Sequence, residues 1–300
     1  MKLATVLLLA MTCAAQVPNW CKSLPRPGYQ TLQRVASPDP WFEVYHVSPG
    51  VFAIYEPHQS EETISYLITG SKQALLLDTG MGIGNLKKVV SSLTKLPVAV
   101  LNTHTHFDHV GNNWQFNTVY GMDTDFTRLS AKGSKEDVQA DIGPAEICGT
   151  LPVGFDAKSF VTKPWKIATY KHDGDKLDLG GRTLRIITTP GHTPDALCVF
   201  DETNGFLFTG DTYYPGTVWL YRPETDLQAY GKSLDKLLLI LPQVKNVLGA
   251  HNFPGAKPEV ITNLAKTFQE VLAGKLQGKP AGPGQVRYKS GDISFLLKAN

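Results

Sequence analysis

Four metal-binding side chains lie within six residues of the sequence, in the stretch His104-Thr105-His106-Phe107-Asp108-His109. Imidazoles and carboxylates are ligands that zinc and other transition metals bind in proteins. The apolar run 98–101 lies just before them and predicts a buried strand. If the chain stays extended past that strand, His104 and His106 point to the same face, because side chains alternate along an extended backbone. The pattern therefore predicts a metal site in a loop that a strand positions.

A polar surface loop is the alternative interpretation of this stretch, and a single histidine would favour it. The other histidines favour the metal site. Five of the eight histidines in the chain lie in contexts that fit a metal ligand: His104, His106, His109, His192 and His251. Structural and catalytic zinc sites draw on just such a ligand set.

Further motifs occur in a fixed order around the histidine cluster. They are Leu76-Leu77-Asp78-Thr79-Gly80, Pro190-Gly191-His192-Thr193-Pro194, Phe208-Thr209-Gly210-Asp211-Thr212 and Gly249-Ala250-His251-Asn252. With these motifs the chain resembles the metallo-β-lactamase-fold hydrolase superfamily, from about residue 51 to about residue 255. The resemblance implies an α/β fold, a four-layer αββα sandwich, and metal-dependent hydrolysis.

The resemblance also implies which residues hold metal. His104, His106 and His192 would bind the first ion; Asp108, His109 and His251 would bind the second; and Asp211 would bridge the two. The ions are expected to be two Zn²⁺, although iron, manganese or nickel also suit these ligands. Two such ions lower the pKa of a bridging water, and Asp108 would hold the resulting hydroxide and later shuttle its proton. Asp78 is expected to support the site without binding metal.

Two positions separate branches of this superfamily. Oxygen-reducing diiron members carry Glu where this chain has His106, so this position does not favour a redox role for the chain. The β-lactamases proper usually carry Cys or Ser where this chain has Asp211, and Asp there resembles glyoxalase II, lactonases and related esterases. The expected substrate is an ester, a thioester or a lactone. The alternatives are β-lactam hydrolysis, a phosphodiesterase, and a non-catalytic metal-binding protein.

Tyr214 follows Asp211 by three residues. In the acyl-homoserine lactonases of this superfamily, a tyrosine at that offset hydrogen-bonds the substrate carbonyl, so Tyr214 is a candidate catalytic residue. The alternative is that Tyr214 and its aromatic neighbours only pack the loop, because aromatic side chains often serve packing alone.

The elements that must position these residues follow from apolar periodicity. Strands are predicted at 51–55, 63–68, 73–78, 98–101, 183–188, 196–200, 205–209, 244–248 and 293–298, with helices at 84–96, 226–241 and 257–272. Asn204-Gly205 predicts a tight hairpin turn between two of the strands. Residues 121–165 form an insertion, which either overhangs the site or is ordinary surface structure.

Composition limits the classes of function. The chain has 300 residues, 42% of them hydrophobic, and a formal net charge of +2. A core of good size is therefore expected, and no segment reaches eighteen consecutive apolar residues, so no membrane span is expected after the first residues. A dedicated nucleic-acid binder would usually show a basic run, so the expected partner is a small-molecule substrate and not a nucleic acid.

The first fifteen residues differ from the rest. Lys2, the apolar stretch 3–9 and the small residues Ala14-Ala15 predict a secretory signal peptide, and thus a secreted or periplasmic protein. Lipidation of Cys13 is the alternative use of this segment. Residues 16–46 are then expected to form an N-terminal surface segment, and 47–300 the hydrolase domain. In an exported chain Cys21 and Cys148 form a disulfide or remain two unpaired thiols.

Overall fold

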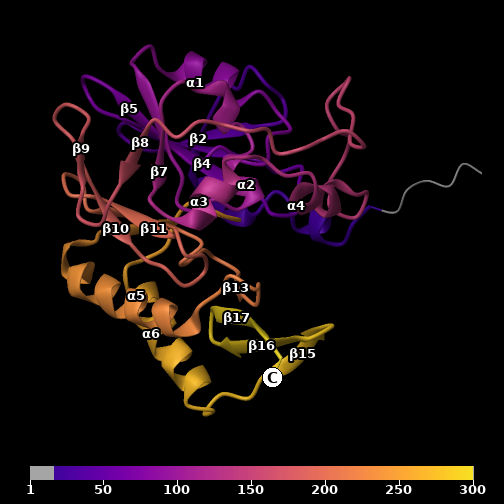
Figure 1. Cartoon of the computed structure of the whole chain (residues 1–300), viewed down its shortest axis with the longest axis vertical. Helices are drawn as coiled ribbons and strands as arrows, with labels where there is room; N and C mark the ends of the chain where they lie inside the picture. Colours follow the sequence, from indigo (N-terminus) through magenta and orange to yellow (C-terminus); the bar gives the residue numbers. More distant parts are fainter. Residues whose placement is uncertain (1–16, 300) are drawn as a thin grey trace, which may run out of the picture.

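Two β-sheets pack against each other around a shared apolar core, with the first sheet in the upper part of Figure 1 and the second below it. The computed structural model describes residues 17–299. The first sheet has eight strands in chain order: β1 (Gln33–Val35), β2 (Glu43–Ser48), β3 (Val51–Tyr55), β4 (Ile64–Thr69), β5 (Ala74–Leu77), β6 (Val98–Leu101), β7 (Val119–Met122) and β8 (Thr169–Lys171). It is antiparallel from β1 to β5 and parallel from β5 to β8.

The second sheet has five strands in the order β14-β12-β11-β10-β9. They are β9 (Lys176–Asp178), β10 (Thr183–Thr188), β11 (Leu197–Asp201), β12 (Phe206–Gly210) and β14 (Asn246–Gly249). Strands β11 and β12 form the hairpin predicted from Asn204-Gly205, and β14 joins β12 in parallel. The predicted strands in this half of the chain are therefore confirmed.

Three apolar cores separate four layers. Alternation along β5 shows the division: Leu75 and Leu77 pack between the two sheets, whereas Ala74 and Leu76 pack on the opposite face with helix α1 (Leu86–Leu93). The second sheet has a similar outer core, where Phe200 and Leu207 meet α5 (Leu227–Ile240) and α6 (Glu259–Leu272). Strands buried on both faces read as continuous apolar runs, which is why they were recognisable in the sequence. The expected αββα sandwich is confirmed.

A third sheet lies at the C-terminal end of the molecule, in the order β13-β17-β16-β15 (Figure 1). Its strands are β13 (Thr217–Leu220), β15 (Lys279–Gly282), β16 (Gln285–Ser290) and β17 (Ile293–Lys298). Only the region of β17 had been predicted as strand. Phe295 and Ile293 of β17 are buried in the core around α5 and α6, so this sheet extends the outer layer.

The predicted N-terminal surface segment, described from residue 17 to residue 46, contributes to the fold more than a surface segment would. Tyr29, Trp41 and Phe42 are buried, and the expected domain boundary at residue 46 lies inside β2. Two short 3₁₀ helices, η1 (Trp20–Ser23) and η2 (Pro27–Thr31), precede the sheet. Between them Arg26 pairs with the buried Glu62 and donates to Asn252 Oδ1 at 2.5 Å, which ties this segment to the chain just after His251.

The insertion between β7 and β8 contains short helices: α3 (Asp125–Ser130), α4 (Glu136–Gln139) and η4 (Ala140–Ile142). Cys21 of the N-terminal segment and Cys148 of the insertion are both free thiols, and burial together with the neighbouring Cys148 raises the pKa of Cys21 to about 12. The predicted signal peptide at residues 1–15 and the lipidation of Cys13 lie outside the described residues. Among residues 17–299 no helix has the length and apolar character needed to cross a membrane.

Candidate metal centre

The candidate ligands all follow the C-terminal ends of strands. His104 and His106 come after β6, and Asp108 and His109 lie on the short helix α2 (Phe107–Val110) that follows directly. His192 comes after β10, Asp211 after β12 and His251 after β14. Gly210 lets the two sheets meet here: its φ is +51°, and a Cβ at this position would lie 2.5 Å from Thr103. Glycine therefore brings Asp211 beside the loop that carries His104.

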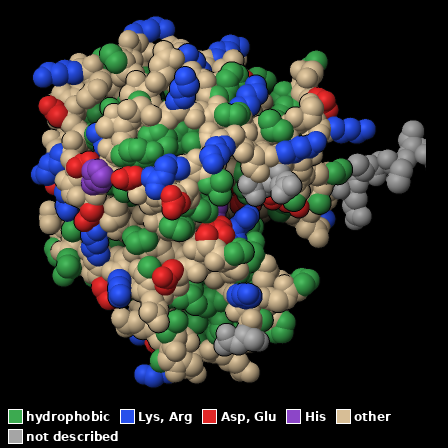
Figure 2. Space-filling view, viewed as in Figure 1, with side chains coloured by type: hydrophobic (Ala, Val, Ile, Leu, Met, Phe, Trp, Pro, Cys, Tyr) green, Lys and Arg blue, Asp and Glu red, His purple; other side chains and the backbone are tan. Residues whose placement is uncertain are grey.

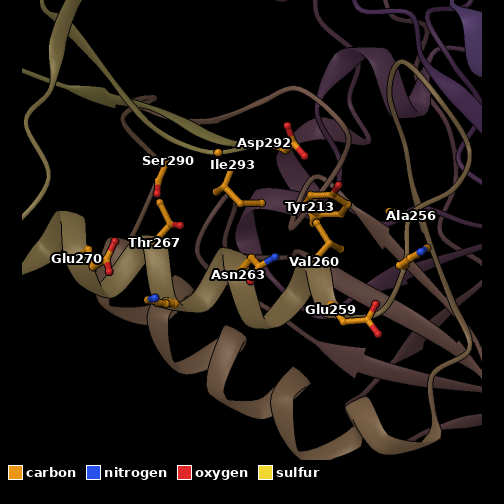
Figure 3. Close-up of a pocket in the computed structure, with 13 residues that line it drawn as sticks. Tyr213, Ala256, Glu259, Val260, Asn263, Thr267, Glu270, Ser290, Asp292 and Ile293 are labelled. Atoms are coloured by element: carbon orange, nitrogen blue, oxygen red, sulfur yellow. The ribbon is translucent and has the colours of Figure 1, made fainter.

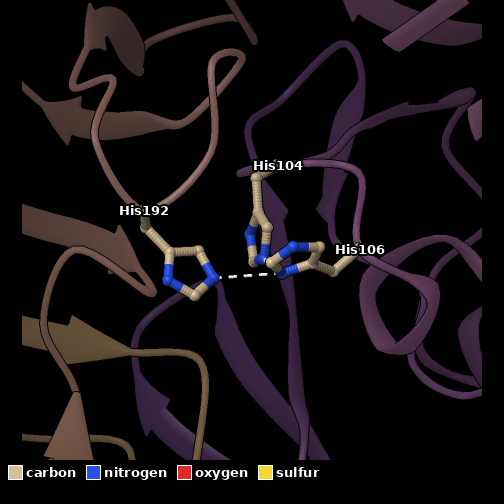
Figure 4. A group of neighbouring side chains, drawn as sticks. All are labelled: His104, His106 and His192. Atoms are coloured by element: carbon tan, nitrogen blue, oxygen red, sulfur yellow. Dashed lines mark hydrogen bonds between the residues drawn. The ribbon is translucent and has the colours of Figure 1, made fainter. Parts of the chain in front are cut away.

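Three imidazole nitrogens converge on one point between the sheets (Figure 4). His106 Nδ1 lies 3.0 Å from His104 Nε2 and 3.0 Å from His192 Nε2. A tetrahedral zinc ion with Zn–N bonds of about 2.0–2.1 Å holds its nitrogen ligands roughly 3.3 Å apart. The spacing of this triad is therefore close to that of a zinc site.

The second nitrogen of each imidazole in the triad already has an oxygen partner. His106 Nε2 lies 2.7 Å from Glu224 Oε1, His192 Nδ1 2.8 Å from the Trp219 carbonyl, and His104 Nδ1 3.3 Å from Thr103 Oγ1. If each ring nitrogen that faces an oxygen carries the proton, the three nitrogens that face one another have lone pairs available for a ligand. A metal ion between them would then be bound by all three rings.

Burial keeps two of these imidazoles neutral. It lowers the pKa of His192 to about 4, although Asp211 opposes this shift. Burial and the neighbouring histidines His109 and His106 also hold the pKa of His104 well below its usual range. A histidine must be neutral to bind metal, so both residues are ready to do so at neutral pH.

A second group lies next to the triad and combines imidazoles with carboxylates. His109 Nε2 is 3.1 Å from Asp108 Oδ2, and His251 Nε2 is 3.6 Å from the same oxygen. Asp211 lies between the two groups: its Oδ1 is 3.0 Å from His251 Nε2, and its Oδ2 is 3.6 Å from His192 Nε2. The carboxylate of Asp211 therefore reaches ligands of both groups, as a bridging residue must.

Three buried atoms of this second group lie close to a charged partner but make no hydrogen bond of normal geometry among the described residues: His109 Nδ1, His109 Nε2 and Asp211 Oδ1. Buried polar atoms are almost always hydrogen-bonded, so this cluster of ligand atoms fits a further partner. The charges agree. Burial would lower the pKa of His251, yet Asp211 and Asp108 raise it to about 9. Carboxylates that hold a proton on a buried imidazole this strongly form a site for a cation, and the residues present fit a metal ion.

Other buried oxygens orient the second group. His251 Nδ1 lies 2.6 Å from the Glu61 carbonyl, and His109 Nδ1 lies 3.0 Å from Asp78 Oδ2. Asp78 also accepts from the backbone N–H and the hydroxyl of Thr103, at 2.7 and 2.8 Å. It stands behind the ligands and does not join them, as the sequence suggested. Its φ of +63° is an uncommon conformation that the two bonds to Thr103 help to maintain.

Asp195 is a buried residue of the site that sequence reasoning missed. It accepts hydrogen bonds from three hydroxyls: Thr105 at 2.6 Å, Thr127 at 2.8 Å and Thr193 at 2.7 Å. Thr105 lies between two ligands, and Thr193 follows His192 directly, so this carboxylate fixes both ligand loops relative to each other. Its place one residue beyond the Pro190–Pro194 motif was the only available signal.

Glu224 was also missed, because it is separated from its partner His106 by 118 residues and lies in no motif. A carboxylate on the outer nitrogen of a metal-binding histidine fixes the ring and makes it a stronger ligand. We expect Glu224→Ala to weaken metal binding at the triad by about 10- to 100-fold, as loss of such partners typically does. Titration of the purified variant with zinc against a chromophoric chelator measures this, and Glu224→Gln, which keeps an acceptor oxygen, is the matched control. Equal zinc affinity in Glu224→Ala and wild type would contradict the assignment.

Tyr214 lies beside the centre, but its hydroxyl points elsewhere. The ring packs edge-on against His251 with 4.7 Å between centroids, and the hydroxyl donates to the Thr217 carbonyl at 2.7 Å. Burial and the nearby carboxylate of Asp211 raise the pKa of Tyr214 well above its usual range, so the hydroxyl keeps its proton. The predicted contact with a substrate carbonyl requires this hydroxyl to leave Thr217.

Two cavities differ in their relation to the centre. A cavity of about 790 Å³ lies between α6 and the turn from β16 to β17, and contains no candidate ligand (Figure 3). A cavity of about 630 Å³ includes His106 and Glu224 in its wall and extends under α3 of the insertion. The second cavity is therefore the one that borders the metal centre. On the face seen in Figure 2, basic and acidic side chains are interspersed and form no single basic patch.

Comparisons with known proteins agree with this geometry. The family model described as the metallo-beta-lactamase superfamily matches residues 62–251. The human acyl-coenzyme A thioesterase MBLAC2 is 26% identical over 227 residues, which cover 70% of this chain and 81% of the thioesterase. A solved metallo-beta-lactamase from Pontibacter korlensis has a TM-score of 0.55 at 19% identity, over 76% of this chain and 99% of that one. A protein solved in a di-iron-bound form, TTHA1623, has a TM-score of 0.50 at 22% identity, over 67% and 93%. Both structural likenesses concern the fold.

Proposed function

The chain belongs to the metallo-beta-lactamase superfamily of hydrolases, and from this membership we propose that it hydrolyses a thioester, or a related ester or lactone, with two bound metal ions. The observation that carries the proposal is the pair of adjacent ligand groups joined by Asp211. Zinc is the proposed metal, because imidazole nitrogens at this spacing suit its tetrahedral coordination. Iron, manganese and nickel compete for the same ligands.

The proposed substrate class rests on two observations. The human relative that matches 70% of this chain is named as an acyl-coenzyme A thioesterase. The bridging position holds Asp211, as in the esterases and lactonases of the superfamily, and not the Cys or Ser usual in the β-lactamases proper. An acyl carbon attached to sulfur or oxygen is the electrophile that both observations favour.

When bound, two dications lower the pKa of a water between them toward neutrality and polarise the carbonyl oxygen under attack. The residues of the chain do the rest. Glu224, the Trp219 carbonyl and the Glu61 carbonyl hold His106, His192 and His251 so that the other nitrogen of each ring already faces the site. Asp108 faces the same space, and although burial raises its pKa, the attraction of His109 lowers it well below its usual range. Asp108 is therefore an ionised carboxylate that can accept a proton from the attacking water and deliver it to the leaving group.

A panel of substrates tests the proposal. The purified chain is loaded with zinc, its metal content is measured by elemental analysis, and it is assayed with a neutral thioester, a chromogenic ester, a lactone and a chromogenic β-lactam. We expect the thioester, the ester and the lactone to be hydrolysed. A chelator should abolish this activity, and added zinc should restore it. Hydrolysis of the β-lactam alone would favour the alternative enzyme class. A chain with two metals and no activity would favour a non-catalytic metal-binding protein.

Tyr214→Phe tests the lactonase-like role of that residue. Because the hydroxyl donates to Thr217 in the structure, we expect its loss to lower the free energy of unfolding by about 1 kcal/mol, the usual value of one hydrogen bond, and to leave turnover near wild type. Thermal unfolding and steady-state kinetics on the best substrate measure the two effects. A fall in turnover of about 10²–10³-fold with metal retained would instead show that the hydroxyl leaves Thr217 and serves the developing oxyanion.

A further inference from the structure

The cavity beside His106 has an apolar wall that begins at the metal centre. Phe126 of α3 lies with its ring 5.9 Å from the ring of His106, and Phe107 and Leu129 contribute further apolar surface. Leu129 is 65% exposed, an unusual position for a leucine unless a ligand covers it. A hydrocarbon arm of a substrate can lie along this wall while the reacting carbon of the same substrate lies beside the three histidines His104, His106 and His192.

A positive charge lies in the same cavity. The guanidinium carbon of Arg222 lies 5.8 Å from the centroid of the Phe107 ring, and Lys132 adds an exposed ammonium at the rim. Arg222 is half-buried, and among the side chains that the structure describes it has no ion pair and no hydrogen bond. Glu224, its neighbour in the cavity wall, is engaged by His106 at 2.7 Å.

The charge of Arg222 affects the pKa of an acidic residue near the site. Burial and the charge of Asp108 raise the pKa of Asp141 to about 6, and Arg222 opposes that shift. The guanidinium therefore lies near the acidic side of the centre without being neutralised by an ion pair. A half-buried guanidinium with no ion pair or hydrogen bond to the protein keeps its donors free for a ligand, and their planar arrangement matches a carboxylate or a phosphate group.

We propose that this cavity binds an apolar arm of the substrate that ends in an oxyanion group, a carboxylate or a phosphate, and that Arg222 binds that group. The proposal rests on the proposed hydrolysis of thioesters and esters, and it defines which of them the chain selects. The oxyanion has two possible sources: the far end of the acyl chain or the leaving group.

Two matched pairs of substrates separate the sources. The acyl pair consists of the hexanoyl and the 5-carboxypentanoyl thioesters of N-acetylcysteamine. The leaving-group pair consists of the hexanoyl thioesters of pantetheine and of pantetheine 4′-phosphate. In each pair the quantity measured is the ratio of kcat/KM for the anionic member to kcat/KM for the neutral member. Arg222→Met removes the charge at similar size, Arg222→Lys keeps it, and Arg287→Met makes the same change on the exposed face of β16, outside the cavity.

We expect Arg222→Met to lower this ratio by about ten- to a hundredfold in one pair, the usual effect of losing a hydrogen bond to a charged group. Arg222→Lys should restore part of the ratio, and Arg287→Met should match wild type. The pair that responds identifies the source of the oxyanion. No change in either pair, or an equal fall in both, would overturn the proposal, because the second result indicates general attraction and not a defined site.

Binding gives a readout that needs no turnover. Calorimetry measures the affinities of hexanoate, hexyl phosphate and hexanol for zinc-loaded wild type and for zinc-loaded Arg222→Met. Each probe is compared between the two proteins, so any affinity that comes from contact with the metals is the same in both and cancels. We expect the variant to lose affinity for at least one anionic probe and not for hexanol. If wild type hydrolyses no thioester or ester, the proposed function fails, while these affinities still decide on Arg222. If it hydrolyses the neutral members and Arg222→Met binds both anions as well as wild type does, only the oxyanion site fails.

Discussion

Asp108→Asn should lower turnover by about 10²–10⁴-fold, the usual cost of removing a general base, and should leave the fold intact. Asparagine has nearly the same shape, so the packing around α2 is preserved. It cannot carry the negative charge that His109 stabilises on the carboxylate, and it cannot accept a proton. We therefore expect Asp108→Asn to lower turnover far more than it harms folding.

Steady-state kinetics, elemental analysis and thermal unfolding of the same preparation measure these effects. Asp235→Asn makes the identical change at an exposed position on α5 and should behave as wild type in all three. A near-wild-type rate in Asp108→Asn, with both metals retained, would mean that another group handles the proton.

Asp211→Ala should abolish activity because the variant loses bound metal. Its two oxygens lie within 3.0–3.6 Å of nitrogens from both ligand groups, so alanine leaves neither group complete. Attraction from His251 and His109 outweighs burial and lowers the pKa of Asp211 to about 2, which shows how strongly this carboxylate is coupled to the imidazoles. Of the two proposed metals, we expect one to be lost and the affinity for it to fall by more than about 100-fold, which exceeds the effect of losing a supporting residue.

Elemental analysis and titration with zinc against a competing chelator provide the measurement, with Asp235→Ala as the control of equal size change. Two firmly bound metals in Asp211→Ala would show that Asp211 does not bridge. Wild type and Asp235→Ala should bind the same number of metals. If wild type holds one metal where Asp235→Ala holds two, the wild-type preparation is incompletely loaded and must be reloaded before the comparison.

The sequence predicted those parts of the molecule that depend on short-range pattern. The ligands were recognisable because each follows an apolar run, and a strand buried on both faces is apolar along its length, as β6 is and as β14 is after Asn246. The turn at Asn204-Gly205 predicted its hairpin from two residues. The order of motifs along the chain then implied the sandwich that the two sheets form.

Elements whose partners lie far along the chain were missed. Strand β13 pairs in parallel with β17, which comes more than 70 residues later, and β15 begins with Lys279-Pro280, which is no strand signal. The same holds for side chains. Nothing local indicated that Glu224 would meet His106, or that the hydroxyl of Tyr214 would turn toward Thr217 and not toward the metals. Such contacts depend on packing between segments that are distant in the chain, and the local pattern of a single sequence does not reveal that packing.

If the proposed ions bind, the division of their ligands between the two halves of the chain would couple the supply of metal to the stability of the sandwich. His104, His106, Asp108 and His109 follow the first sheet, whereas His192, Asp211 and His251 follow the second. Ions held by both halves favour the assembled state by mass action, by about 2.7 kcal/mol for an ion at 100 times its dissociation constant. The melting temperature of such a protein is then a function of free metal concentration. A cell compartment that is poor in metal would hold this chain as a less stable protein, more open to proteolysis, even with every residue unchanged.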